Sequence, residues 1–376
     1  MSKTNIAPSA FFFLFFQLII SCSKNDNKIT TKEELITELK SEMNKEKMTS
    51  MSFAVLKNDS LILTGALGYS HKRNNILATP ETRYLIASVS KTITCVALLQ
   101  LYEQGLFSLD DDINIFLPFN VRNPKFPNDK ITFRMLLSHY SGISDSYQNT
   151  LDLDCYGSDC PMSLATYFNN VFSKSGKYFS TENYSTSKPG TMENYRNLGL
   201  ALVGYLVERI ANQSFDTYCK TNIFQRLEMT KTEWRLNNVP QDQLAIPYSP
   251  DITNANPHYT FPDYPNGGLR TTVIDFSKFL RAIIMNGSFR GNQILKPSTN
   301  NLIKTLQFGS DVQALTFYFE TINGERLLGH SGGEKGVSTE MFFNPLNNIG
   351  VIIFNNDDDI NLNNTVSLLV NFGKNQ

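Results

Sequence analysis

The sequence lacks the features that mark nucleic-acid-binding and metal-dependent proteins. Its 34 lysines and arginines are scattered and balanced by 35 acidic residues, so no basic surface for nucleic acid is indicated. It has only four histidines, no H-E-x-x-H motif, and no cysteines or histidines with the spacing of metal ligands. We therefore expect no metal, no other cofactor and no nucleic-acid partner.

Long apolar runs are also scarce. The run from Ala10 to Ile20 is too short for a comfortable transmembrane helix; it follows Lys3 and ends on small residues, as a cleavable export signal does. The cysteine at the cleavage point, Cys22, resembles the lipobox of bacterial lipoproteins. We predict a signal peptide over 1–22, lipidation of Cys22, a polar tether over 23–31 and anchoring in the bacterial cell envelope, facing the periplasm or the surface. An ordinary secretory signal is the alternative.

Cysteine is rare as well, with five in 376 residues. Cys155 and Cys160 lie close together in the loop-like stretch DCYGSDC, and in an oxidising compartment a local disulfide between them is expected. Cys95 is expected to be a buried core thiol, whereas Cys219 has no obvious partner.

The sequence does contain enough apolar residues, 41%, to bury a full core. Strand-like segments occur near both ends of the chain, within 52–64 and 314–354, and the middle is mostly helix and long loop. This order predicts an α+β fold, an α/β sandwich in which one antiparallel sheet is built from both chain ends and flanked by helices. The predicted units are a sheet domain of residues 32–109 and 305–376 and a mostly helical domain of residues 110–304.

The stretch Tyr84–Gly105 stands out because an almost uniformly apolar helix begins there with polar residues. Such a helix belongs in a core. Ser88 and Lys91 form an S-x-x-K motif, whose spacing places both side chains on one face of the first turn. Burial disfavours a charged ammonium, and the positive end of the helix disfavours it further. Lys91 is therefore expected to be a neutral amine that can take the proton of Ser88.

Two further motifs add to this signal. Tyr195 and Asn197 form a Y-x-N motif at the entrance of the apolar helix 198–211, and Gly329-His330-Ser331-Gly332-Gly333 ends a predicted strand. The latter segment also fits G-x-S-x-G, the nucleophile elbow of α/β-hydrolases. No histidine follows Ser331, however, so the usual triad order of that class cannot be completed.

Taken together, S-x-x-K, a later Y-x-N and then H-S-G on a late strand resemble the serine β-lactamase and penicillin-binding-protein superfamily. The resemblance is to its class C-like branch, with D,D-peptidases, D-aminopeptidases and family VIII esterases. It runs in family order over nearly all of the mature chain and implies the β-lactamase/transpeptidase-like fold. The blocks that carry it are YLIASVSKT, LFSLDDDINIFLP, ITFRMLLSHYSGI, PGTMENYRNLGLALVGYLVERI, NGGLRTT and LLGHSGGEKG.

The resemblance implies catalytic roles for three side chains. Ser88 would attack a carbonyl to form an acyl-enzyme, while Lys91 and Tyr195 would share the serine's proton and pass one to the leaving group. Asn197 is implied to hold Lys91 and the amide of the substrate. The other implied contacts are the strand residues His330, Ser331 and Gly332 beside the substrate, and an oxyanion hole of the backbone N–H groups of Ser88 and Gly333.

Two departures from the family pattern bear on the substrate. His330 stands where many β-lactamases have the lysine of K-T-G, which removes a permanent cation that would bind a substrate carboxylate. Arg196 replaces a small residue between the tyrosine and the asparagine. Both weaken the case for efficient lactam hydrolysis but not the case for acyl chemistry on a serine. His139, in the block ITFRMLLSHYSGI, is interpreted as structural.

The leading hypothesis is an exported serine hydrolase that forms an acyl-Ser88 intermediate on a small-molecule, peptide, amide or ester substrate. A true β-lactamase is the alternative within the enzyme class. A catalytically inactive binding lipoprotein on the same fold is the alternative outside it. The loops 145–190 and 236–268 shape the pocket, and their composition does not identify the physiological substrate.

Overall fold

The computed structural model describes residues 28–249 and 255–376. The predicted signal peptide with Cys22 and residues 23–27 of the predicted tether lie outside the described residues. Within the described residues, no helix is both long enough and apolar enough to span a membrane.

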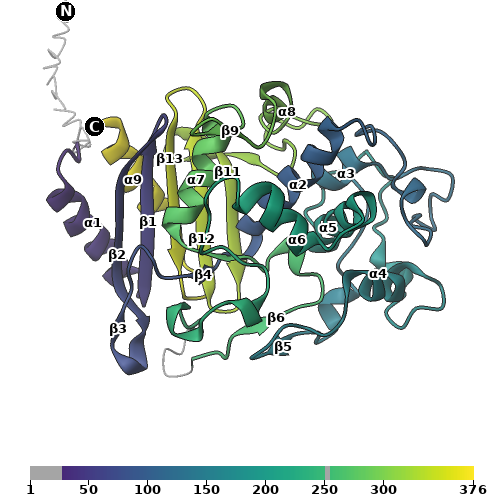
Figure 1. Ribbon diagram of the computed structural model, residues 1–376, viewed down its shortest axis with the longest axis horizontal. Coiled ribbons are helices and arrows are strands. Elements are labelled where there is room, and N and C mark those ends of the chain that lie inside the picture. Colours follow the sequence, from purple (N-terminus) through teal and green to yellow (C-terminus); the bar gives the residue numbers. More distant parts are fainter. Residues whose placement is uncertain (1–27, 250–254) are drawn as a thin grey trace, which may run out of the picture.

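One antiparallel sheet of seven strands forms the centre of the fold, in the order β10-β11-β12-β13-β1-β2-β3 (Figure 1). Pairing of β1 with β13 joins the N-terminal strands to the C-terminal ones. The predicted α+β fold with a sheet from both chain ends is therefore confirmed. The strands are β1 (Ser50–Lys57), β2 (Ser60–His71), β3 (Ile76–Leu77), β10 (Tyr318–Ile322), β11 (Glu325–Glu334), β12 (Val337–Asn344) and β13 (Ile349–Asn355).

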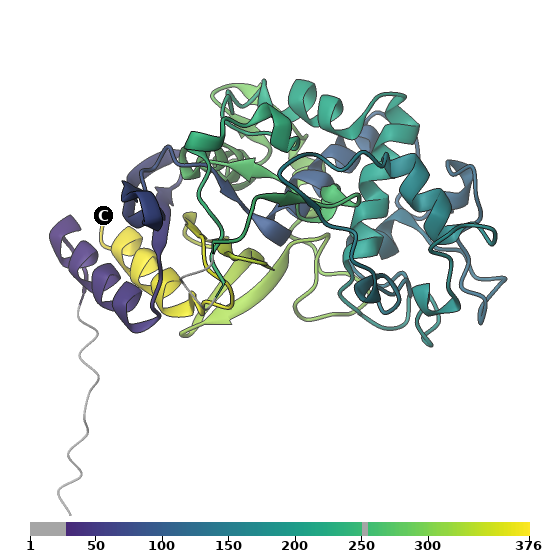
Figure 2. The same cartoon turned by 90° about the horizontal axis from the view of Figure 1, so that it is seen from below.

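Helices cover both faces of this sheet, because its inner strands are apolar on both sides. Phe53 of β1 packs in a core cluster with α1 (Lys32–Lys45) and α9 (Asn363–Lys374), which lie side by side (Figures 1 and 2). The next residue, Ala54, points into the opposite core, as the alternation of a strand requires. There α7 (Val273–Ile284) packs on β1 and β13, although it falls within the predicted helical domain.

The buried helix predicted after Ser88 is α2 (Lys91–Glu103), which packs against α5 (Asn197–Ala211). Every residue of α2 up to Leu101 is buried. Ser88 itself lies one turn earlier, in the 3-10 turn Ala87–Ser90 that leads into the helix.

The other described α-helices are short: α3 (Phe133–Leu137), α4 (Leu164–Phe172), α6 (Phe215–Cys219) and α8 (Pro297–Leu302). Short strand pairs also lie outside the main sheet: β4 (Tyr84–Leu85) with β7 (Arg270–Thr271), and β8 (Ser288–Phe289) with β9 (Asn292–Gln293).

The stretch 145–190, which the sequence favours as loop, contains α4 and a disulfide-closed segment. Cys155 and Cys160 are joined by the disulfide, with their Cα atoms 5.3 Å apart. The strand β5 (Cys155–Tyr156) pairs with β6 (Tyr259–Thr260), which ties this segment to the second long loop. The remaining cysteines of the described chain are both buried and free: Cys95 and Cys219.

Candidate active site

Ser88 and Lys91 meet at the start of α2. Lys91 Nζ lies 2.7 Å from Ser88 Oγ and donates a second hydrogen bond of 2.7 Å to the backbone carbonyl of Asn266. The lysine side chain is buried, and Ser88 is half-buried at the edge of a cavity. In the described chain, no carboxylate forms an ion pair with Lys91. An amine held by two neutral oxygens in a buried site can exchange a proton with the serine.

The turn that presents Ser88 has an unusual backbone. Ala87 has a φ of +45°, a region that residues with a side chain rarely adopt. Neighbouring elements hold the turn in place. The Thr339 hydroxyl of β12 donates to the carbonyl of Ile86 at 2.9 Å, and the Ile86 N–H donates to the carbonyl of Leu269 at 3.0 Å. These contacts hold the turn from two sides and direct Ser88 into the cavity.

The loop that holds Lys91 is itself held by a carboxyl group. Asn266 Nδ2 donates to Asp263 Oδ2 at 2.8 Å and to the Asp263 carbonyl at 2.7 Å. Burial raises the pKa of Asp263 to about 7, and the negative charge of Asp145 adds to the rise. The carboxyl group of Asp263 therefore changes its charge near neutral pH. It contacts Lys91 through Asn266, which donates to Asp263 and accepts from Lys91.

Tyr195 approaches this pair with its ring. Lys91 Nζ lies 5.2 Å from the ring centre, and no hydrogen bond joins the Tyr195 hydroxyl to Ser88 or Lys91 in the described structure. The side chain is 42% exposed. Two histidine rings lie beside it, that of His139 with its centre 4.5 Å away and that of His330 with its centre 6.1 Å away. The structure thus brings Tyr195 next to Ser88 and Lys91.

Asn197, the first residue of α5, is positioned by a cap from another segment. The side chain of Arg196, which occupies the N-cap position, makes no capping hydrogen bond. The Asp145 carboxylate replaces it, accepting the N–H of Asn197 at 2.7 Å and that of Leu198 at 2.9 Å. Asn197 Oδ1 is buried without a partner in the described chain. The cap therefore fixes Asn197 while its amide oxygen stays available to a substrate.

β11 lines the cavity with neutral groups. His330 is buried, and its Nδ1–H donates to the carbonyl of Ser331. Burial lowers the pKa of His330 to about 3, with Lys91 contributing, so the imidazole is neutral. Ser331 Oγ lies 2.7 Å from the hydroxyl of Tyr318 on β10. In the described structure, this strand therefore offers hydrogen-bonding groups and no cation to the cavity.

Gly332 lets β11 approach the turn that carries Ser88. A methyl group on Gly332 would lie 3.0 Å from Ser88 N, 2.7 Å from the carbonyl oxygen of Ile86 and 2.4 Å from Thr339 Oγ1. The next residue, Gly333, lines the same cavity as Ser88. The two residues predicted to supply the oxyanion hole thus belong to a strand and a turn that meet here.

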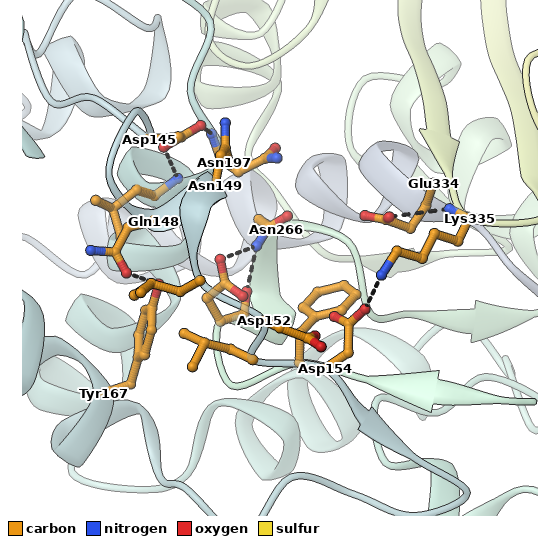
Figure 3. Close-up of a pocket in the computed structure, with 15 residues that line it drawn as sticks. Asp145, Gln148, Asn149, Asp152, Asp154, Tyr167, Asn197, Asn266, Glu334 and Lys335 are labelled. Atoms are coloured by element: carbon orange, nitrogen blue, oxygen red, sulfur yellow. Dashed lines mark hydrogen bonds and ion pairs between the residues drawn. The ribbon is translucent and has the colours of Figure 1, made fainter. Parts of the chain in front are cut away.

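Two cavities share Asn197. The first, of about 450 Å³, contains Ser88, Tyr195 and the β11 residues. The second, of about 350 Å³, is lined in part by Asp152 and Asp154, which precede the disulfide-closed segment in the chain (Figure 3). In the described part of the chain, no three His, Cys, Asp or Glu side chains are grouped as a metal site. The charged residues that line the second cavity are Asp145, Asp152, Asp154, Asp263, Glu334 and Lys335, the last of which is ion-paired with Asp154.

Sequence reasoning did not assign three of the side chains found at the site. Tyr318 precedes the β11 motif by a hairpin, and nothing in its local sequence distinguishes it. His139 and Asp145 lie in and just after the block ITFRMLLSHYSGI, where polar residues follow an apolar segment. This change from apolar to polar residues is the only local feature that marks them. Their hydrogen-bond partners lie far away in the sequence: Arg196 for His139, and Asn197 for Asp145.

A seven-stranded antiparallel sheet with a serine–lysine pair at the start of a buried helix defines the fold class of the penicillin-binding-protein-like serine hydrolases. Within that class the chain belongs to the β-lactamase family, whose family model, Beta-lactamase, matches residues 35–365. This confirms the class C-like resemblance and the β-lactamase/transpeptidase-like fold predicted from the sequence.

The curated sequences to which the chain is similar are distant. It is 25% identical over 329 residues to Protein flp of Staphylococcus aureus (strain MRSA252), covering 87% of this chain and 63% of the relative. It is 26% identical over 339 residues to Beta-lactamase-like protein 4 of Dictyostelium discoideum, covering 81% of this chain and 56% of the relative. The chain thus spans about three fifths of the length of these relatives.

Solved structures share the fold over most of the chain. A D-amino acid amidase from Ochrobactrum anthropi SV3, complexed with L-phenylalanine, has a TM-score of 0.73 at 19% identity, covering 91% of this chain and 99% of that one. D-alanine carboxypeptidase AmpC from Burkholderia cenocepacia has a TM-score of 0.70 at 18% identity, covering 91% and 98%. The octameric penicillin-binding protein homologue from Pyrococcus abyssi has a TM-score of 0.70 at 22% identity, covering 89% and 75%. Identities this low show a shared fold alone.

Proposed function

We propose that this protein is an exported serine hydrolase that forms an acyl-Ser88 intermediate on an amide, peptide or ester. The observation that carries the proposal is the distance of 2.7 Å between buried Lys91 Nζ and Ser88 Oγ. Burying a lysine without a carboxylate partner costs folding free energy. Proton exchange with a nucleophilic serine is a function that would explain why a lysine is buried here. An amidase and a carboxypeptidase with the same fold support the reaction class.

In the proposed reaction, Ser88 Oγ attacks the substrate carbonyl and Lys91 takes the hydroxyl proton. The carbonyl oxygen becomes an oxyanion, which accepts hydrogen bonds from the backbone N–H groups of Ser88 and Gly333; one such donor is typically worth about 10²–10³ in rate. Lys91 and Tyr195 pass a proton to the leaving nitrogen or oxygen, which departs as acyl-Ser88 forms. Water then attacks the acyl group, which releases the acid and restores Ser88.

Charge around the site favours some substrates over others. In the described structure, no lysine or arginine lines the cavity that contains Ser88, so a carboxylate there would find no ion-pair partner. The second cavity, next to Asn197, is lined by five acidic side chains and by Lys335, which is paired with Asp154. An amine on the acyl part of the substrate would be attracted to it. Esters and amides of amino acids fit this distribution better than penicillins or peptides with a free C-terminal carboxylate.

Export is part of the proposal, with lipidation of Cys22 as the membrane anchor. The apolar run Ala10–Ile20 ahead of this cysteine supports it. The disulfide between Cys155 and Cys160 supports it independently, because structural disulfides persist in oxidising compartments. Radiolabelled palmitate should be incorporated by cells that express the full chain, and not by cells that express Cys22→Ala.

The test of the chemistry uses the soluble chain from Lys24 with two serine variants. Ser88→Ala removes the proposed nucleophile. Ser185→Ala is the matched control, because Ser185 begins a second S-x-x-K motif but its hydroxyl donates to the Ser187 carbonyl in a loop. Intact mass is recorded after incubation with a fluorophosphonate and with a penicillin, and turnover of amino-acid esters and amides is measured.

Labelling and turnover in wild type and Ser185→Ala, both absent in Ser88→Ala, are the expected result. Penicillin hydrolysed without a lasting adduct would make the protein a β-lactamase. A folded wild type that is neither labelled nor active would favour the binding lipoprotein. Equal labelling of Ser88→Ala would show that another residue is the nucleophile.

A further inference from the structure

The backbone on either side of Tyr195 is clamped by a single residue. The Asn194 N–H donates to the carbonyl oxygen of His139 at 2.8 Å, and the Arg196 N–H donates to His139 Nδ1 at 3.2 Å. The Tyr195 hydroxyl has no hydrogen-bond partner in the described structure, so it does not orient the side chain. These two bonds fix the main chain on both sides of the residue that carries the phenol.

The His139 ring also contacts the ring of Tyr195 directly. The two ring centres are 4.5 Å apart with an interplanar angle of 37°, which is within the range of aromatic packing. The same phenol ring lies near Lys91, whose Nζ is 5.2 Å from its centre. A change in the His139 contact would therefore alter the placement of Tyr195 relative to Lys91.

His139 has the properties that a clamp requires. It is 4% exposed and adopts a left-handed backbone with φ of +62°, which histidine and asparagine tolerate better than most residues. Burial lowers its pKa well below the usual value, and the neighbouring side chains of Lys91, His330 and Arg196 add to the decrease. The ring is thus neutral. Its proton lies on Nε2, because Nδ1 accepts the Arg196 N–H.

We propose that His139 is a positioning residue that holds the Tyr195 phenol against Lys91 through two backbone hydrogen bonds and a ring contact. The inference rests on the proposed function, in which Tyr195 and Lys91 carry a proton to the leaving group. Histidine combines an acceptor nitrogen and a flat ring. Asparagine retains the acceptor and tolerates the left-handed backbone, whereas phenylalanine retains the ring but leaves the Arg196 N–H unpaired.

The first test compares two esters of the same acid, one with a p-nitrophenyl and one with an alkyl leaving group. Delivery of a proton matters most for the alkoxide, which is the poorer leaving group. His139→Phe is expected to lower kcat for the alkyl ester by about 10²-fold, the scale of a misplaced catalytic group, with little change in KM. The p-nitrophenyl ester should lose far less. His139→Asn should recover most of kcat, and equal losses for both esters in both variants would overturn the proposal.

A second test removes the hydroxyl that His139 is proposed to position. In a Tyr195→Phe background, His139→Phe is expected to reduce kcat for the alkyl ester by no more than about twofold, because the two residues act as one unit. A full additional loss in that background would show that His139 acts elsewhere. Thermal unfolding of each variant, followed by circular dichroism, identifies any variant that does not fold.

A third measurement does not require turnover. Fluorotyrosine at position 195 should give a shifted fluorine resonance that moves toward that of the free amino acid in His139→Phe and changes less in His139→Asn. An unchanged resonance in both variants would refute positioning. An inactive wild type whose resonance still depends on residue 139 would refute the proposed function while retaining the clamp, so the two failures can be distinguished.

Discussion

The carboxylate of Asp145 accepts the backbone N–H of Asn197 at 2.7 Å and thereby caps α5 from a distant segment of the chain. It also accepts the N–H of Leu198 at 2.9 Å. The helix needs this partner because the side chain of Arg196 at its N-cap makes no capping bond. A single carboxylate therefore contributes to the stability of α5 and to the position of Asn197 in the cleft.

Asp145→Ala is expected to lower the free energy of unfolding by about 1–2 kcal/mol, the usual cost of removing a helix cap. Denaturation in urea, followed by circular dichroism, measures it. Asp145→Asn keeps one acceptor oxygen and should lose less. If the alanine variant were as stable as wild type, the cap would not contribute to stability.

Asp263 leads to a prediction about pH. Its pKa rises from 3.8 to about 7, chiefly because it is buried. Between these values the unfolded chain has lost a proton that the folded chain still holds, so this group makes the free energy of unfolding fall as the pH rises from about 4 to about 7. Asp263→Asn removes this contribution. The variant should therefore gain stability relative to wild type across that interval, as urea midpoints at pH 5 and pH 8 would show; parallel pH profiles would contradict the shift.

Gly332→Ala is expected to separate β11 from the Ser88 turn. The added methyl would lie 2.4 Å from Thr339 Oγ1 and 2.7 Å from the Ile86 carbonyl oxygen, so the strand has to move. A displacement of about 1 Å at a catalytic site can cost about 10² in rate. Ester turnover measures the loss. Gly199→Ala is the matched control, since its methyl would have no neighbour nearer than 3.6 Å.

Removing the disulfide should destabilise the segment that directly follows Asp154 in the wall of the second cavity. The double variant Cys155→Ser/Cys160→Ser is expected to lose about 2 kcal/mol of stability, the chain-entropy value for so short a loop. Thermal unfolding with and without a reductant tests this. Reductant should lower the unfolding temperature of wild type and leave that of the double variant unchanged. If the two proteins unfolded at the same temperature without reductant, the disulfide would not be stabilising.

Glu334→Gln tests the charge preference of the cleft. Glu334 lies at the end of β11 and lines the second cavity (Figure 3). Burial raises the pKa of Glu334, so the test is made at alkaline pH, where the carboxylate is charged. Its removal there is expected to reduce kcat/KM for an ester with an amine on its acyl group by about fivefold, which corresponds to ~1 kcal/mol. The matched neutral ester should change little. Equal effects on both esters would show that the carboxylate does not discriminate by charge.

Sequence patterns predicted much of the fold because its elements depend on local periodicity. The apolar segment after Ser88 became α2, and the segment after Asn197 became α5. Strand-like segments at both ends of the chain paired as β1 and β13. The helix α4 was not predicted, since it is short and lies among loop-forming residues. Likewise, α7 falls within the predicted helical domain but packs on the sheet, a contact that no local pattern encodes.

The sequence by itself determined the family, because S-x-x-K, Y-x-N and H-S-G stand along the chain in the order that the family shares. The S-x-x-K spacing also brings Ser88 and Lys91 together, because three residues span about one turn. Only the tertiary structure decided what surrounds them. The Asn266 carbonyl, the Asp145 cap and the His139 clamp contact their partners from segments far away in the chain. Such contacts depend on the packing of α2 against α5 and of β11 against the turn Ala87–Ser90. The charge of the two cavities has the same origin, since their linings come from several segments that only folding brings together.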